Sequence, residues 1–202
     1  MMKYIEEFEQ KLDAGRIELS DELKLCELYS AVHDTNRLYS VATKLYVDLL
    51  AVGTNVHPSV QYRSAKVLRD AGKLQEMEKV LDACLPRIPQ NVPAKTFLEI
   101  ARMYTAISKH EKTATALEKY LVNNPRVWEA WVELSSLRLA TGKTNESVHA
   151  MNQAVRLGDR RALEVIGQNP FLDKLWHDSL RARAGLTNAP PPAVMKPEPP
   201  KP

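Results

Sequence analysis

Apolar residues recur at intervals of three and four along most of the chain, which is the spacing of amphipathic helices. The clearest stretch is residues 128–158, where two such patterns lie on either side of Gly142-Lys143. Glycine readily takes the left-handed backbone conformation that ends a helix, and two helices joined by so short a link pack antiparallel. The pattern therefore predicts a helical hairpin over residues 128–158.

Earlier parts of the chain repeat this pattern at an almost constant interval. Phe97 stands 34 residues before Trp131, in the equivalent place of a hairpin that begins at Ala94. A third copy begins at Pro58, 36 residues before Ala94, so two residues are inserted near Gln90-Asn91. Units that recur at such a period stack on their neighbours in helical repeat proteins. The sequence therefore predicts three successive helical hairpins.

The two ends of this array differ from its middle. A fainter copy spans Glu22–Leu50, with its turn predicted at Asn36 or Arg37, and residues 2–14 form one more amphipathic pattern. After the last hairpin, the pattern indicates two short helices that break at Asn169-Pro170. We expect these helices to cap the array, because the terminal element of a repeat array needs a polar outer face.

The predicted fold class is all-α, and the composition supports it, because only 7 of 202 residues are glycine. The expected organisation can be given in order along the chain. It consists of an N-terminal helix in 1–20, a degenerate helix pair in 21–57, hairpin repeats in 58–91, 92–125 and 126–158, capping helices in 159–185, and a disordered proline-rich tail in 186–202.

Charge is distributed unevenly, although the formal net charge is only +3. Residues 1–57 carry 6 basic and 10 acidic side chains, whereas residues 58–126 carry 12 basic and 7 acidic ones. Charge of this kind bears on partners rather than on the fold. The net value alone is too small to indicate a nucleic-acid partner.

Several function classes lack their sequence signatures. No Gly-rich phosphate loop, nucleophile elbow or spaced set of metal ligands occurs, so we expect no enzyme activity, no cofactor and no metal. No apolar run approaches the roughly 18 residues of a membrane helix, and the acidic N-terminus does not resemble a signal peptide. We therefore expect a cytoplasmic protein, while a fragment of a longer protein remains an alternative. Cys26 and Cys84 lie in apolar patterns and are expected to be buried thiols.

The repeat pattern resembles the tetratricopeptide repeat (TPR) family over roughly residues 22–158. The residues that match the family's signature are, unit by unit, Ala65, Gly72, Leu74, Leu81 and Pro89; Phe97, Ile100, Ala101, Tyr104, Leu117 and Pro125; and Trp131, Leu134, Ser135, Gly142, Ser147, Met151 and Ala154. The sequence departs from the family at Met77, Thr113 and Ser147, which replace the alanine of the second helix, and at Ser108, which replaces the turn glycine. The resemblance implies a right-handed α-solenoid of antiparallel helix pairs, whose first helices line a concave groove. It also implies a scaffold or adaptor that binds a peptide or a partner helix in that groove.

Under this resemblance, the first helices place polar and charged side chains in the groove. The candidate groove residues are Tyr62, Arg63, Lys66, Arg69, Lys95, Leu98, Glu99, Arg102, Glu129, Val132, Glu133 and Ser136. We name as the basic cluster Arg63, Lys66, Arg69, Lys95 and Arg102. It would attract an acidic peptide, a C-terminal carboxylate or a phosphate, since arginine binds such groups through two hydrogen bonds. The alternative interpretation is a solvated helix face.

A more specific role within the family is not matched. Members that grip the C-termini of heat-shock chaperones carry Lys and Asn, then Asn, then Lys and Arg along successive first helices. The matching places here hold Tyr62 and Lys66, then Glu99, then Glu129 and Glu133. The asparagines are missing and the last pair has the wrong sign, which argues against a chaperone clamp.

The sequence leaves three functions open. The first is a non-catalytic scaffold with a protein or peptide partner and no small-molecule substrate. The second is a TPR domain appended to a larger bacterial enzyme or complex, which could be membrane-bound. The third is RNA binding, which is weaker, because the groove positions mix acids with bases and lack a repeated base-reading pair. The sequence indicates neither the partner's identity nor the oligomeric state.

Overall fold

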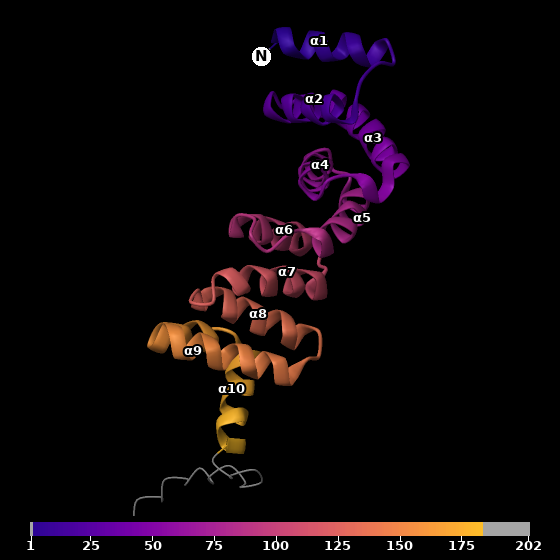
Figure 1. The fold of residues 1–202 in the computed structure, drawn as a ribbon. Helices are drawn as coiled ribbons and strands as arrows, with labels where there is room; N and C mark the ends of the chain where they lie inside the picture. The colour runs from indigo at the N-terminus through magenta and orange to yellow at the C-terminus, as the bar shows by residue number, and fades with distance from the viewer. Residues whose placement is uncertain (1, 184–202) are drawn as a thin grey trace, which may run out of the picture. The chain divides into compact units, whose positions relative to one another are not determined.

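The structure, a computed structural model, describes residues 2–183 (Figure 1). Its helices are α1 (Met2–Asp13), α2 (Leu19–Ala31), α3 (Thr35–Val52), α4 (Pro58–Asp70), α5 (Leu74–Cys84), α6 (Ala94–Ala106), α7 (His110–Asn123), α8 (Trp128–Ala140), α9 (Thr144–Gly167) and α10 (Pro170–Arg183). The short 3₁₀ helices η1 (Gly53–Asn55) and η2 (Leu85–Arg87) follow α3 and α5. Residues 2–183 contain no strand, so the predicted all-α class is confirmed. The predicted tail at 186–202 lies outside the described residues.

Consecutive helices pack as antiparallel hairpins, namely α2–α3, α4–α5, α6–α7 and α8–α9 (Figure 1). The chain divides after Asn124 into two compact units, of which the first holds α1–α7 and the second α8–α10. Within the first unit, α2 packs against α4 as well as against its own hairpin partner, so first helices are neighbours. No helix in the described part of the chain is long and apolar enough to cross a membrane.

Each hairpin closes in the same way. The second residue after the first helix has a left-handed backbone, with φ between 56° and 76°, and these residues are His33, Gly72, Ser108 and Gly142. The next N–H donates to the carbonyl five residues earlier, at 2.8 to 3.0 Å, and satisfies a helix-end acceptor. The first turn therefore lies at His33. The predicted turn at Asn36 or Arg37 is wrong, because both residues lie inside α3.

A small side chain stands seven residues before each of these turns. Cys26, Ala65, Ala101 and Ser135 are all buried, with at most 1% of their surface exposed. In the last hairpin this position contacts the second helix directly, because the Ser147 hydroxyl donates to the Ser135 carbonyl at 2.9 Å. Burial raises the pKa of Cys26 to about 12, so its thiol packs as a small apolar group and stays protonated. Cys84 is likewise buried and free, with its pKa raised to about 12 by burial.

The second unit extends its hairpin into a cap. α9 breaks at Asp159, where φ is 52° and ψ is −131°, and α10 packs back against α9 and α8. Met151, Ala162 and Leu172 belong to the buried core of this unit, and Trp128 packs against it.

We predict that Gly158→Ala destabilises the second unit by about 1–2 kcal/mol, because an alanine methyl would overlap the Trp128 ring. A Cβ on Gly158 would lie 2.6 Å from Trp128 Cγ. Gly167→Ala is the matched control, since its nearest contact would be 3.9 Å away. Urea unfolding followed by tryptophan fluorescence tests this, because all 3 tryptophans of the chain lie in the second unit. Equal stability of the two variants would contradict the packing argument.

The first unit contains one fully buried carboxylate, Glu22, between α2 and α3. The Lys44 ammonium donates to Glu22 and, at 2.6 Å, to Asp48. Burial raises the pKa of Glu22 above its ordinary value and outweighs the opposing hydrogen bond from Lys44. Hydrogen bonding to Lys44 lowers the pKa of Asp48. The folded state therefore disfavours the charge of Glu22 and favours that of Asp48.

These shifts act in opposite directions on stability. Because the pKa of Glu22 is raised in the folded state, Glu22 destabilises the fold as the pH rises above its ordinary pKa and through the folded one. The pKa of Asp48 is lowered in the folded state, so the stability that Asp48 contributes is lost only as the pH falls below its ordinary pKa. Glu22→Gln removes the first effect, since an amide can accept from Lys44 without a charge. We therefore predict that the free energy of unfolding of this variant, relative to that of the wild type, increases as the pH is raised from 4 to 7. Urea unfolding followed by circular dichroism measures it, with Glu6→Gln on the exposed face of α1 as the control that shows no such gain.

Candidate peptide-binding surface

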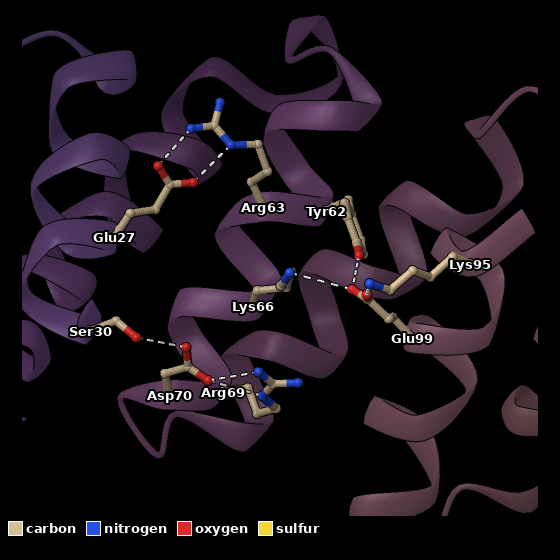
Figure 2. A network of polar contacts seen from close by, with 9 residues as sticks. All are labelled: Glu27, Ser30, Tyr62, Arg63, Lys66, Arg69, Asp70, Lys95 and Glu99. Carbon is tan, nitrogen blue, oxygen red and sulfur yellow. Dashed lines mark hydrogen bonds and ion pairs between the residues drawn. The ribbon is translucent and has the colours of Figure 1, made fainter. Parts of the chain in front are cut away.

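Polar side-chain contacts join the first helices α2, α4 and α6 of the first unit, and we call the surface that carries them the first-helix surface (Figure 2). It holds the candidate residues of α4 and α6, and Figure 2 shows most of their charged groups turned toward carboxylates of the same chain. The candidates of α8 belong to the second unit. Eight of the predicted residues lie on α4 and α6 of the first unit: Tyr62, Arg63, Lys66, Arg69, Lys95, Leu98, Glu99 and Arg102. Of these, Tyr62, Lys66 and Lys95 contact Glu99 directly.

Arg63 connects α4 to α2. Its Nε and Nη2 atoms each donate to Glu27 at 2.8 Å, which is the two-bonded arrangement that fits a guanidinium to a carboxylate. This hydrogen bonding raises the pKa of Arg63. A second link between the same helices runs from the Ser30 hydroxyl to Asp70 at 2.8 Å. Asp70 also accepts from Arg69 Nε and Nη2, at 3.0 and 2.8 Å.

Glu99 is the centre of a second group, which connects α4 to α6. Its carboxylate accepts from the Tyr62 hydroxyl and lies 3.3 Å from Lys66 Nζ and 3.5 Å from Lys95 Nζ (Figure 2). The hydrogen bond from Tyr62 lowers the pKa of Glu99, and the two lysines lower it further. Burial, together with the Glu99 charge, raises the pKa of Tyr62. At neutral pH the carboxylate is thus ionised and the phenol protonated.

These contacts change the interpretation of the basic cluster, because most of its charges are paired within the chain. The sequence suggested a free positive patch, yet Arg63, Arg69, Lys66 and Lys95 all contact carboxylates of the chain itself. Of the five residues of the basic cluster, only Arg102 has no polar contact within residues 2–183. Four cations of the basic cluster therefore share three carboxylates and Arg102 contacts none, so the cluster carries two more positive charges than these carboxylates neutralise. The surplus lies toward α6, where the Lys95 side chain is 80% exposed.

The candidates of α8 have a different environment. Val132 is only 7% exposed and lies in the core of the second unit with Leu172 of α10, so it cannot contact a partner. Ser136 lines a pocket of about 600 Å³ with residues of α10, including Phe171. Glu129 and Glu133 are exposed. α10 thus covers part of the face of α8 that was expected to line the groove. The apolar pattern of α8 by itself could not reveal this cover.

Sequence reasoning missed the carboxylate partners Glu27 and Asp70. The signal for Glu27 was present, because Glu27 and Arg63 are 36 residues apart, close to one repeat. Lys66 and Glu99, at 33 residues, show the same spacing. Opposite charges at one repeat length on neighbouring first helices are expected to meet.

Comparisons with known proteins identify the fold. No protein-family model and no curated protein matches the chain. Among solved structures, a crystal structure of MamA is 18% identical, covers 78% of this chain and 82% of its own, and has a TM-score of 0.53. YrrB, described as a TPR protein with an unusual peptide-binding site, is 12% identical, covers 88% of this chain and 96% of its own, and has a TM-score of 0.50.

These similarities confirm the TPR-like fold that the repeat pattern suggested. At such low identity they establish the arrangement of helices and no more. The binding properties of this chain must therefore be argued from its own residues.

We predict that Glu99→Gln lowers the free energy of unfolding by about 1–2 kcal/mol, because the Tyr62 hydroxyl loses a charged acceptor and two lysines lose their carboxylate. Tyr62→Phe should cost a similar amount. The double variant should cost less than the sum of the two, because both changes remove the same hydrogen bond. Urea unfolding followed by circular dichroism measures these effects.

Glu164→Gln is the matched control for Glu99→Gln. It breaks the Arg160–Glu164 pair, whose side chains are 90% and 59% exposed. Such exposed pairs contribute little. If Glu99→Gln changed stability no more than this control does, the Glu99 group would not hold α4 and α6 together.

Proposed function

We propose that this protein is a non-catalytic scaffold that binds a protein or peptide partner on the first-helix surface of its first unit. The observation that supports this most directly is the surplus of positive charge at α6. Arg102 has no polar contact within residues 2–183, and Lys95, seven residues before it on the same helix, shares the single carboxylate of Glu99 with Lys66. An acidic segment of a partner would complement them.

The paired charges also favour this function over a general anion surface. Arg63 and Arg69 are already held by carboxylates, so a ligand gains little from them unless it displaces Glu27 or Asp70. A nucleic-acid backbone requires many unpaired cations along its path. Two surplus charges suit a short acidic segment better than a phosphate backbone.

The first-helix surface is also held in place before a partner arrives. The Glu27 group connects α2 to α4 through two exposed hydrogen bonds from Arg63, and the Glu99 group connects α4 to α6 through a partly buried hydrogen bond from Tyr62. A pre-organised surface loses less conformational entropy on binding. This rigidity supports a binding role and requires no catalytic group.

We predict that the double variant Lys95→Glu and Arg102→Glu binds its natural partner at least about tenfold more weakly, because both surplus charges are reversed. Affinity capture from the native organism, read by mass spectrometry, identifies the partner, and titration with the purified partner gives the affinity. Lys79→Glu, on the second helix α5, reverses one charge away from the surface and serves as the control.

Circular dichroism should show that both variants remain folded, since the Lys95–Glu99 pair is exposed at the lysine. A partner that is retained equally by the wild type and the double variant would rule out the α6 charges as its binding site.

A further inference from the structure

A pocket of about 330 Å³ opens at the N-terminal ends of α4 and α6. Its lining is mostly apolar and includes Pro58, Tyr62, Ile88, Pro89, Val92 and Pro93. Tyr62 and Arg63 belong both to this lining and to the first-helix surface, so the pocket adjoins that surface (Figure 2).

The pocket owes its wall to the irregular step of the repeat. Nine residues, 85–93, connect α5 to α6, whereas five residues connect α3 to α4. The longer connection contains the two residues inserted near Gln90-Asn91, and it supplies Ile88, Pro89, Val92 and Pro93 to the lining. A regular repeat would lack this wall.

The connection is also held in a fixed shape. Ile88 is only 5% exposed, and its N–H donates to the Cys84 carbonyl at 3.2 Å. The Asn123 amide of α7 donates to the Gln90 carbonyl at 2.6 Å. Prolines at 86, 89 and 93 fix the backbone further. The pocket is therefore formed before any ligand binds, which is typical of binding sites.

Its size and lining define the ligand. Ligand sites usually enclose roughly 300–1,000 Å³, so this pocket is at the small end and suits one bulky side chain rather than a cofactor. Aromatic anchors in such pockets carry much of the energy of protein interfaces. The charged or ionisable side chains of the lining, apart from the Tyr62 phenol, are His57 and Arg63, and no carboxylate lines it. Lys95, next to the lining residue Thr96, adds an exposed positive charge.

We propose that the pocket receives an aromatic side chain of a peptide partner, and that an acidic residue beside this anchor contacts Lys95. This inference rests on the proposed function and specifies the partner's chemistry. The proline-rich residues 187–202 of the chain contain no aromatic residue, so they lack the anchor that the pocket fits.

Selection of random peptides displayed on phage against the immobilised full chain tests the proposal. We expect the enriched peptides to share an aromatic residue next to Asp or Glu. Fluorescein-labelled synthetic copies of these peptides are then titrated against the wild type, Val92→Trp and Val122→Trp. Val92 lines the pocket, whereas Val122 is 65% exposed on α7, so the two variants make the same substitution inside and outside it.

Val92→Trp should weaken binding at least about tenfold by filling the pocket, while Val122→Trp should bind like the wild type. Replacing the aromatic residue of the peptide by alanine should weaken its binding to the wild type by a similar factor. This second measurement tests the proposal even if Val92→Trp does not fold. Peptides that bind Val92→Trp as tightly as the wild type, or that survive the alanine change, would overturn the pocket assignment and leave the proposed function standing.

Two other outcomes are equally informative. A complete lack of enriched peptides would overturn both the pocket assignment and peptide binding by this surface. Displacement of the labelled peptides by a synthetic peptide of residues 187–202, at similar affinity, would show that the chain's own segment occupies the pocket and would overturn the assignment to a partner.

Discussion

The closure of each hairpin is the constraint on which the rest of this structure depends. The first helix of each hairpin ends just before a left-handed residue, and the second helix begins two residues after it; these residues are His33, Gly72, Ser108 and Gly142. Because the stop falls at the same place each time, a small residue seven positions earlier is always buried at the same level of the hairpin. Small residues there allow two backbones to approach closely, as in other tightly packed helix pairs. The register of the first helices, and hence of the surface they share, follows from this closure.

That shared register explains why the charges pair as they do. When first helices lie side by side in register, a residue on one meets a residue about one repeat later on the next, as Glu27 meets Arg63. The same geometry places Glu99 against Tyr62 and Lys66. These contacts join repeats through polar groups, of which the Tyr62–Glu99 hydrogen bond is partly buried. They also reduce the positive charge that a ligand can reach. The same side chains thus stabilise the packing between repeats and weaken the electrostatic attraction for an acidic partner.

The sequence could predict whatever is periodic. The hairpins, their order and their buried faces follow from apolar spacing and from Gly72 and Gly142, and the structure has the fold that this spacing suggested. The first turn was misplaced because His33 takes a backbone that usually indicates glycine. Val132 was misassigned because its cover, α10, comes from another part of the chain. The partners of the basic cluster were missed because faces were compared within helices rather than between repeats.

A periodic surface has a difficulty of its own as a binding site, because equivalent positions offer a ligand several similar registers. A feature that occurs once can remove this ambiguity. In the first unit, the connection of residues 85–93 departs from the regular repeat, and it builds an apolar wall beside the surface that carries the surplus charge of α6. An anchor that fits only there would fix where a bound segment begins, and the charges of Lys95 and Arg102 would then set its direction. The irregular step is therefore the part of this array best suited to confer specificity, although it contributes least to the repeat pattern.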